Sequence, residues 1–307
     1  MKKKPKSPVL PGNPKDPTGV DRLERGAMKA FAERMKRIRK VYIDILERIP
    51  ASPAVNQRYA FDLDVTLLTM LLNNASLNVD ELLYGSTENN WFWSDYVSTA
   101  YQRGTAQEFA NLSRQSAVYA AGQQNLQTIL ISAPFRKRMA LLRARLFEEM
   151  RGLSADVKAN MARILTDGLG RGQAPRDIAK RLTEQTGIES RRANRIARTE
   201  ITTALRRARW DESDDATEQY GIKSRLMHIS ALSPTTRATH AARHAHLYTT
   251  DDVREWYSTG ANAINCKCSQ ISVLVDDDGK PLDEKVIERA RKTFNTIRAR
   301  GYEWAED

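Results

Sequence analysis

Apolar residues recur at three- and four-residue spacing along most of the first 220 residues of this 307-residue chain. That period places apolar side chains on one face of an α-helix, so it constrains the fold more than any other feature. It predicts long helices over 21–49 and 54–83, another running from 91 toward 119, and helices over 135–150, 154–168, 175–186 and 189–212.

The pattern changes after Tyr220. Ile222–Ser230 and Ser269–Val275 have the short apolar character of strands, and the second is followed by a turn signal, Asp277-Asp278-Gly279. A last helix is predicted over 282–300. The fold class is therefore mainly α with a small α+β C-terminal domain, built from helices and a short antiparallel sheet.

Three regions are predicted along the chain. Residues 1–20 are rich in Lys and Pro with few apolar anchors, which predicts a disordered basic arm. Residues 21–150 form a helical, partner-binding region, and residues 151–307 form the α+β domain with its C-terminal helix. The aromatic residues of 91–93 fit either a protein interface or a buried aromatic cluster.

Basic residues outnumber acidic ones, with 49 Lys and Arg against 38 Asp and Glu, a net charge of +11. Most of the excess, +8, lies in residues 1–50. Such a balance points to an acidic partner, with nucleic acid the first candidate. In the arm the candidate contacts are Lys2, Lys3, Lys4 and Lys6.

Membrane insertion and export are not expected. No apolar run approaches the ~20 residues that span a bilayer, and the Lys-rich start lacks the apolar stretch of a signal peptide. The chain has two cysteines, which excludes a disulfide-stapled secreted scaffold and suits a reducing compartment.

The helix over 189–212 carries an arginine face opposite an alanine-rich face. This arginine face is either a solvated surface or a contact for phosphate or an acidic protein. Glu200 falls on the apolar side, where an unpaired carboxylate is costly. We expect it to pair with Arg237 or the His240 region, in a structural rather than an acid–base role. The candidate anion contacts on the arginine face are Arg191, Arg195, Arg206 and Arg209.

All four histidines lie between residues 228 and 246, and both cysteines follow at 266 and 268. Imidazole nitrogen and thiolate sulfur are ligands that zinc accepts in a tetrahedral site. His240 and His244 are four residues apart, so on a helical turn they would share a face. The candidate metal ligands are therefore His240, His244, Cys266 and Cys268. A structural zinc site, a metal-free packed cluster, and a catalytic metal or nucleophilic cysteine all remain open.

Several short motifs occur in a characteristic order, and in that order residues 155–275 resemble the Mu F-like family of phage minor head, or head morphogenesis, proteins. The motif positions are Arg198, Thr199, Glu200, Arg237, His240, Cys266 and Cys268. The motifs are a glycine-punctuated junction at 168–172, the Ala-Arg-Thr-Glu step at 197–200, the Arg-x-x-His step at 237–240, and Asn-Cys-Lys-Cys at 265–268.

The resemblance implies a low-copy structural protein of a tailed bacteriophage, acting in head morphogenesis and located in the virion, in the head interior or at the portal vertex, after assembly in the host cytoplasm. The implied partners are the portal protein, the major capsid or scaffolding protein, and packaged double-stranded DNA, with roles in DNA packaging or ejection. No catalytic activity follows from the resemblance.

Two other functions compete with this one. The His/Cys/Glu set could serve a metal-dependent nuclease- or toxin-like enzyme. A DNA-binding regulator is the third reading, disfavoured because neither helix-turn-helix nor zinc-finger spacing is present.

Overall fold

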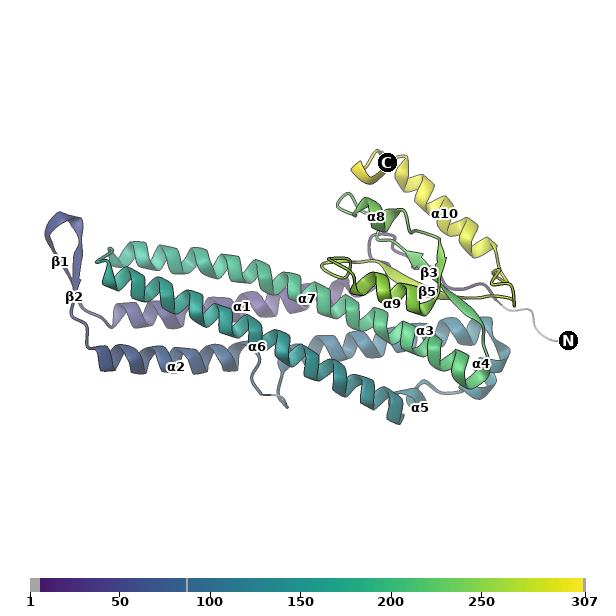
Figure 1. Ribbon diagram of the computed structural model, residues 1–307, viewed down its shortest axis with the longest axis horizontal. Helices are drawn as coiled ribbons and strands as arrows, with labels where there is room; N and C mark the ends of the chain where they lie inside the picture. The colour runs from purple at the N-terminus through teal and green to yellow at the C-terminus, as the bar shows by residue number, and fades with distance from the viewer. Residues whose placement is uncertain (1–5, 87, 306–307) are drawn as a thin grey trace. The chain divides into compact units, whose positions relative to one another are not determined.

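The computed structural model describes residues 6–86 and 88–305, and it confirms a mainly helical chain with a small antiparallel sheet (Figure 1). None of its helices is both long and apolar enough to cross a membrane. The strands are β1 (Ala51–Pro53), β2 (Tyr59–Phe61), β3 (Ser224–Ile229), β4 (Leu247–Tyr248) and β5 (Ser269–Leu274). The α-helices are α1 (Asp21–Glu47), α2 (Val65–Leu83), α3 (Ser98–Gln115), α4 (Ala117–Gly122), α5 (Leu126–Leu130), α6 (Ala133–Gly170), α7 (Pro175–Tyr220), α8 (Ala238–Ala241), α9 (Thr250–Ser258) and α10 (Lys285–Arg298), with short helical turns at Val55–Gln57, Trp93–Val97 and Glu303–Ala305.

Helices α6 and α7 are longer than the patterns predicted. The breaks expected near Gly152 and Gly187 do not occur, because a glycine costs a helix only about 1 kcal/mol and packing of the flanking turns overrides it. Leu153, directly after the first glycine, is fully buried. The helix predicted from residue 54 instead begins at Val65, where the Asp64 carboxylate accepts hydrogen bonds from the next turn.

The chain divides into two compact units, each assembled from segments that are distant in sequence. This differs from the predicted boundary at residue 150, because α6 continues through that position. The first unit contains the N-terminal segment up to Glu24 together with Tyr96–Ala140 and Arg198–Asp307, and the second contains Arg25–Asp95 and Leu141–Ala197.

The second unit is built from four long helical segments, contributed by α1, α2, α6 and α7. The Asp80 carboxylate of α2 accepts hydrogen bonds from Ser154 and Lys158 of α6 at 2.7 Å each. Phe31 of α1 lies edge-on to Trp91 and Phe92, with ring centroids 4.8 and 5.2 Å apart. Of the two alternatives for the aromatic segment, the structure thus shows a buried cluster around Phe92.

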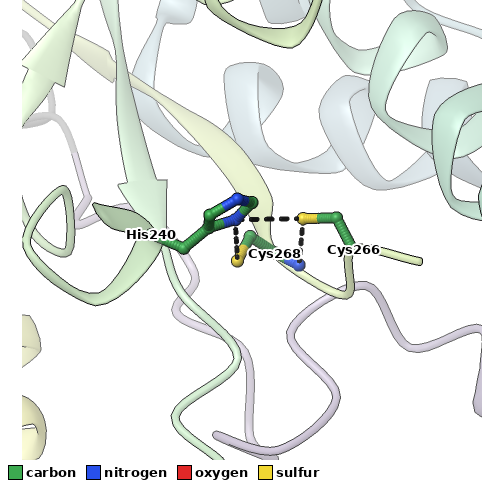
Figure 2. A group of neighbouring side chains, drawn as sticks. All are labelled: His240, Cys266 and Cys268. Atoms are coloured by element: carbon green, nitrogen blue, oxygen red, sulfur yellow. Dashed lines mark hydrogen bonds between the residues drawn. The ribbon is translucent and has the colours of Figure 1, made fainter. Parts of the chain in front are cut away.

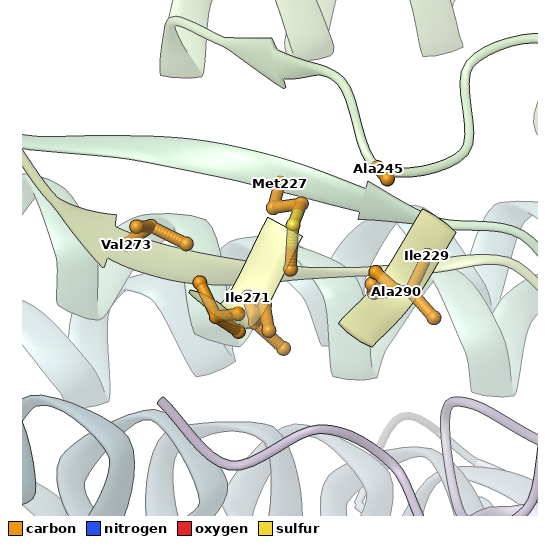
Figure 3. Packing of buried hydrophobic residues seen from close by; sticks show 7 residues of the cluster. Met227, Ile229, Ala245, Ile271, Val273 and Ala290 are labelled. Carbon is orange, nitrogen blue, oxygen red and sulfur yellow. The ribbon is translucent and has the colours of Figure 1, made fainter. Parts of the chain in front are cut away.

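The first unit contains the three-stranded sheet, in the order β4-β3-β5 with antiparallel pairing. Both predicted strands are confirmed within two residues, and Ser224 pairs with Leu274 while Ile229 pairs with Ser269. The side chains of one face, including Met227 and Ile271, pack with α10 (Figure 3). Those of the other face, including Leu226, pack with α7 and α9. The sheet is therefore covered on both faces.

Side chains of α3 cover the edge of β5 that does not pair with another strand. Glu108, Asn111 and Gln115 are spaced by three and four residues and so lie on one face of the helix. The Ser272 amide donates to Glu108, and Asn111 and Gln115 both donate to the Ser272 carbonyl at 2.9 Å. The Leu274 amide donates to Gln115 at 3.1 Å. These side chains satisfy backbone groups that a fourth strand would otherwise pair with.

The prediction of a disordered arm is wrong for residues 6–20, which pack against the first unit. Val20 and Thr18 are fully buried, and Gln107 donates to the Thr18 carbonyl at 3.1 Å. The Pro14 carbonyl accepts from the Leu232 amide. Proline leaves few backbone donors to satisfy, so an extended segment of this composition can be held through its carbonyls. Lys2, Lys3 and Lys4 lie outside the described residues.

Gly104 of α3 allows a close helix contact within the first unit. A Cβ atom at this position would lie 2.3 Å from the Leu205 carbonyl oxygen and 2.8 Å from Ala208 Cβ. We expect Gly104→Ala to lower the free energy of unfolding by about 1–3 kcal/mol, as overpacking does. Urea denaturation measures it.

The matched control is Gly152→Ala, whose Cβ would meet no atom within 4 Å. It should raise stability by up to about 1 kcal/mol through helix propensity. Equal stabilisation by both substitutions would contradict the close contact.

Candidate metal centre

His240 lies on α8, and Cys266 and Cys268 precede β5, yet the fold brings all three together (Figure 2). His240 Nδ1 lies 3.4 Å from Cys266 Sγ and 3.6 Å from Cys268 Sγ. One potential ligand atom from each residue lies within 4.8 Å of the others. All three side chains are buried, with at most 3% exposure. The residues are therefore arranged as metal ligands would be.

The predicted fourth ligand, His244, is not part of this group. Its Nδ1 accepts a hydrogen bond from the Ser230 amide at 3.1 Å, and its Nε2 lies 3.2 Å from the Ala290 carbonyl oxygen. Burial lowers the pKa of His244 to about 4, so the ring is neutral near pH 7. With both nitrogens engaged, His244 has a structural role.

The Ala-Arg-Thr-Glu step of α7 holds the residue that precedes the cysteines. The Asn265 amide donates to the Thr199 hydroxyl at 2.9 Å, and Arg198 donates to the Asn265 side-chain oxygen at 2.7 Å. Arg198 also pairs with the buried Glu24 carboxylate at 2.9 Å. Asn265 has a φ of 55°, a left-handed conformation that asparagine tolerates better than most residues. The turn into Cys266 is thus fixed from α7.

Two further arginines hold the carbonyls of the same segment. Arg206 donates to the Cys266 and Cys268 carbonyls at 3.0 and 3.3 Å, and its guanidinium lies over the Tyr257 ring. Arg237 donates to the carbonyls of 261, 262 and 264. Side chains of α7 and the residue that precedes α8 therefore converge on the segment 261–268.

The arginine face of α7 is only partly a surface. Arg191 and Arg195 are exposed, as the prediction of an anionic contact requires. Arg206 and Arg209 are buried, at 0% and 4% exposure, and that prediction is wrong for them. Arg206 binds backbone carbonyls, and Arg209 pairs with Glu108 at 2.9 Å. Angular position identifies a helix face but not which neighbour covers it.

Glu200 is buried at 5% exposure, which confirms its position on the apolar side of the helix. Its pairing with Arg237 or the His240 region stays a prediction. Arg237 itself binds loop carbonyls, as described above.

Hydrogen-bond donors surround the two sulfurs. The Cys268 amide lies 3.4 Å from Cys266 Sγ, and the Tyr257 hydroxyl lies 3.8 Å from the same sulfur. The Ser230 hydroxyl lies 3.5 Å from Cys268 Sγ. The Cys268 thiol, the Arg206 charge and His240 lower the pKa of Cys266 well below its usual value. Burial and the neighbouring Cys266 raise the pKa of Cys268, so the two thiols are shifted in opposite directions.

The three residues line one wall of a cavity of about 460 Å³ in the first unit. Most of the other lining side chains are polar, and four of them are cationic against one acidic group, Asp21. The cationic residues are Lys15, Arg198, Arg237 and Lys267.

Several residues around the centre were not predicted. Asp21 accepts a hydrogen bond from Lys267 at 2.6 Å, across 246 positions of sequence. His228 is fully buried beside the centre and lies 3.1 Å from the Gln270 amide nitrogen. Its closeness in sequence to the other histidines was the only available signal, since long-range contacts leave no local pattern.

Part of this chain, including the candidate metal ligands, is similar to one known protein family. No curated protein matches the chain, and no solved structure matches it. A family model described as Phage Mu protein F like protein matches residues 159–271. This span contains Arg198, Thr199, Arg237, His240 and both cysteines. The match confirms the resemblance that the motifs indicate: residues 159–271 of this chain are similar to the Phage Mu protein F like family.

Proposed function

We propose that this protein is a minor head component of a tailed bacteriophage that acts at the portal during head morphogenesis. The family match over residues 159–271 carries the proposal, because it supports a role in phage head morphogenesis and association with the virion. Portal binding, contact with the major capsid or scaffolding protein, and roles in DNA packaging or ejection extend the proposal beyond that family-level statement.

The structure of the motif region favours a structural role over a catalytic one. Three of the motif side chains, Arg198, Thr199 and Arg237, hold the segment 261–268 through Asn265 and through backbone carbonyls. Because these side chains already use their polar atoms in hydrogen bonds that fix the loop, those atoms are not free to act on a substrate. We propose that the region is a rigid module and that assembly contacts lie on its exterior.

We propose that fewer residues contact DNA than the sequence predicted. Among the described candidates, Lys6, Arg191 and Arg195 are exposed. Cationic side chains in such positions bind phosphate with strong salt dependence. Arg206 and Arg209 are excluded from this role because they are buried.

Mass spectrometry of purified virions and procapsids, with copy counting, tests the proposal. We expect this chain in both particles at far lower copy than the major capsid protein, and we expect it to be retained by immobilised portal protein. The major capsid protein is the internal standard for copy number. Absence from both particles and from the portal eluate would contradict the proposal.

An enzyme of the nuclease or toxin type is the second candidate, because the His/Cys/Cys group lines a polar cavity. Metal-dependent cleavage of plasmid DNA by the purified chain, abolished by His240→Ala, would favour it. The exposed His246 provides the control variant, His246→Ala, which should leave any such cleavage intact.

A further inference from the structure

We propose that His240, Cys266 and Cys268 bind one zinc ion whose fourth coordination position opens to the polar cavity and takes an anionic oxygen ligand. Zinc binding at this position is independent of where the protein acts in the phage head. The geometry of the three side chains, their surroundings and the cavity they line support it.

The distances fit tetrahedral zinc. Bonds of about 2.3 Å to sulfur and about 2.0 Å to nitrogen, at a tetrahedral angle, separate the two ligand atoms by about 3.5 Å. The observed Nδ1–Sγ distances are 3.4 and 3.6 Å. The imidazole nitrogen faces both sulfurs (Figure 2). Both nitrogen–sulfur distances are therefore those that a shared zinc ion requires.

The imidazole is poorly satisfied without a metal. His240 is 2% exposed, and its Nδ1 contacts the two sulfurs, which are weak hydrogen-bond partners. Its Nε2 is buried and has no hydrogen-bond partner among the described residues. Burying a polar ring with such partners is costly. A metal bound at Nδ1 gives that nitrogen a strong partner in place of two weak ones, and the proton then lies on Nε2.

The surroundings favour thiolates. A backbone amide, a Tyr hydroxyl and a Ser hydroxyl reach the sulfurs, as described above. The Arg206 guanidinium is held beside both cysteines through their carbonyls. Outer contacts of this kind orient metal ligands and stabilise their charged forms.

The fourth position is open. Within residues 6–86 and 88–305, no fourth His, Cys, Asp or Glu joins the group. Structural zinc sites use four protein ligands, whereas three protein ligands leave a position for an exogenous one. That position faces a cavity lined by four cationic side chains and by Asp21. Glu24 and Asp21 offset the charges of Arg198 and Lys267. The charges of Lys15 and Arg237 remain in excess and favour an anionic oxygen, from a carboxylate or a phosphate.

Zinc content of the full-length chain, purified without chelators from zinc-supplemented cells, tests the metal. We expect about one zinc ion per chain, and a strong loss in Cys266→Ser, Cys268→Ser and His240→Ala. His246→Ala is the matched control and should keep its zinc, since His246 is exposed and lies outside the group.

A second measurement avoids variants that fail to fold. The wild-type chain is stripped with a chelator and titrated with Co²⁺, which should produce a thiolate-to-cobalt charge-transfer band and d–d bands of tetrahedral cobalt. Substoichiometric zinc together with no charge-transfer band would overturn the site.

The open position has its own test on the cobalt-loaded chain. Adding inorganic phosphate or acetate should shift the d–d bands, and the more effective anion identifies the oxygen source. Lys15→Glu should raise the concentration needed for the shift. Bands that neither anion changes at saturating concentration would show a closed site and overturn the proposed fourth ligand.

Discussion

Replacing Glu108 with alanine is expected to lower the free energy of unfolding by about 3–5 kcal/mol, the cost of breaking a buried ion pair. The side chain of Glu108 is 0% exposed and that of its partner Arg209 is 5% exposed, with 2.9 Å between their charged atoms. The substitution leaves the arginine charge buried without its carboxylate. It also removes the acceptor for the Ser272 amide.

Urea denaturation at pH 7 measures this effect. Glu33→Ala is the control, because the Glu33–Lys36 pair is exposed and such pairs contribute at most about 1 kcal/mol. The double variant Glu108→Leu/Arg209→Met should recover part of the loss, since replacing both charges removes the unpaired one. A single variant as stable as the wild type would show that this pair does not support the sheet edge.

The second large effect is a pH-dependent increase in the free energy of unfolding, expected for Glu212→Gln. Burial raises the pKa of Glu212 to about 7, and the nearby charges of Asp215 and Glu108 add to the rise. The Tyr119 hydroxyl, which donates to this carboxyl group at 2.5 Å, and the Arg138 charge oppose it. In the folded protein Glu212 therefore holds its proton up to near neutral pH.

The sign of the pH dependence follows from this raised pKa. Between about pH 4.5 and 7 the folded state binds more protons at Glu212 than the unfolded state, so stability falls as the pH rises. Above pH 7 Glu212 is ionised in both states, and its burial then lowers the free energy of unfolding by on the order of 3 kcal/mol. The glutamine side chain of the variant keeps an acceptor for the Tyr119 hydroxyl and carries no charge at any pH.

Glu212→Gln should therefore be more stable than the wild type by about that amount at pH 8, and nearly equal to it at pH 4. Thermal unfolding across this range measures the difference, and other titrating groups cancel between the two proteins. The exposed Glu218 provides the control Glu218→Gln, which should show no such trend. A gain that is independent of pH would rule out titration of Glu212 as its cause.

The fold class and the two main strands could be predicted because they rest on local patterns. The strands are short apolar runs, and the turn after β5 has its own signal. The cysteines and His240 could be grouped by chemistry. His244 could not be excluded, because the four-residue rule assumes a continuing helix, and α8 ends at Ala241.

Other features could not be predicted because they depend on which segments meet. Residues 6–20 have the composition of a disordered segment, yet their carbonyls are held by distant residues such as Gln107 and Leu232. The arginine face of α7 was correct as geometry, but Arg206 and Arg209 are covered by the segment before β5 and by α3. Tertiary contacts of this kind override local propensity.

The covered edge of β5 has a consequence for how copies of this chain meet. An open sheet edge is a template for strands of other molecules and a route to aggregation. Here the outward backbone groups of Ser272 and Leu274 are already bonded to α3, and the opposite edge strand, β4, has only two residues. Copies of this chain at high local concentration therefore have no open edge of β5 through which to pair their sheets, and we expect each copy to stay a separate folded molecule.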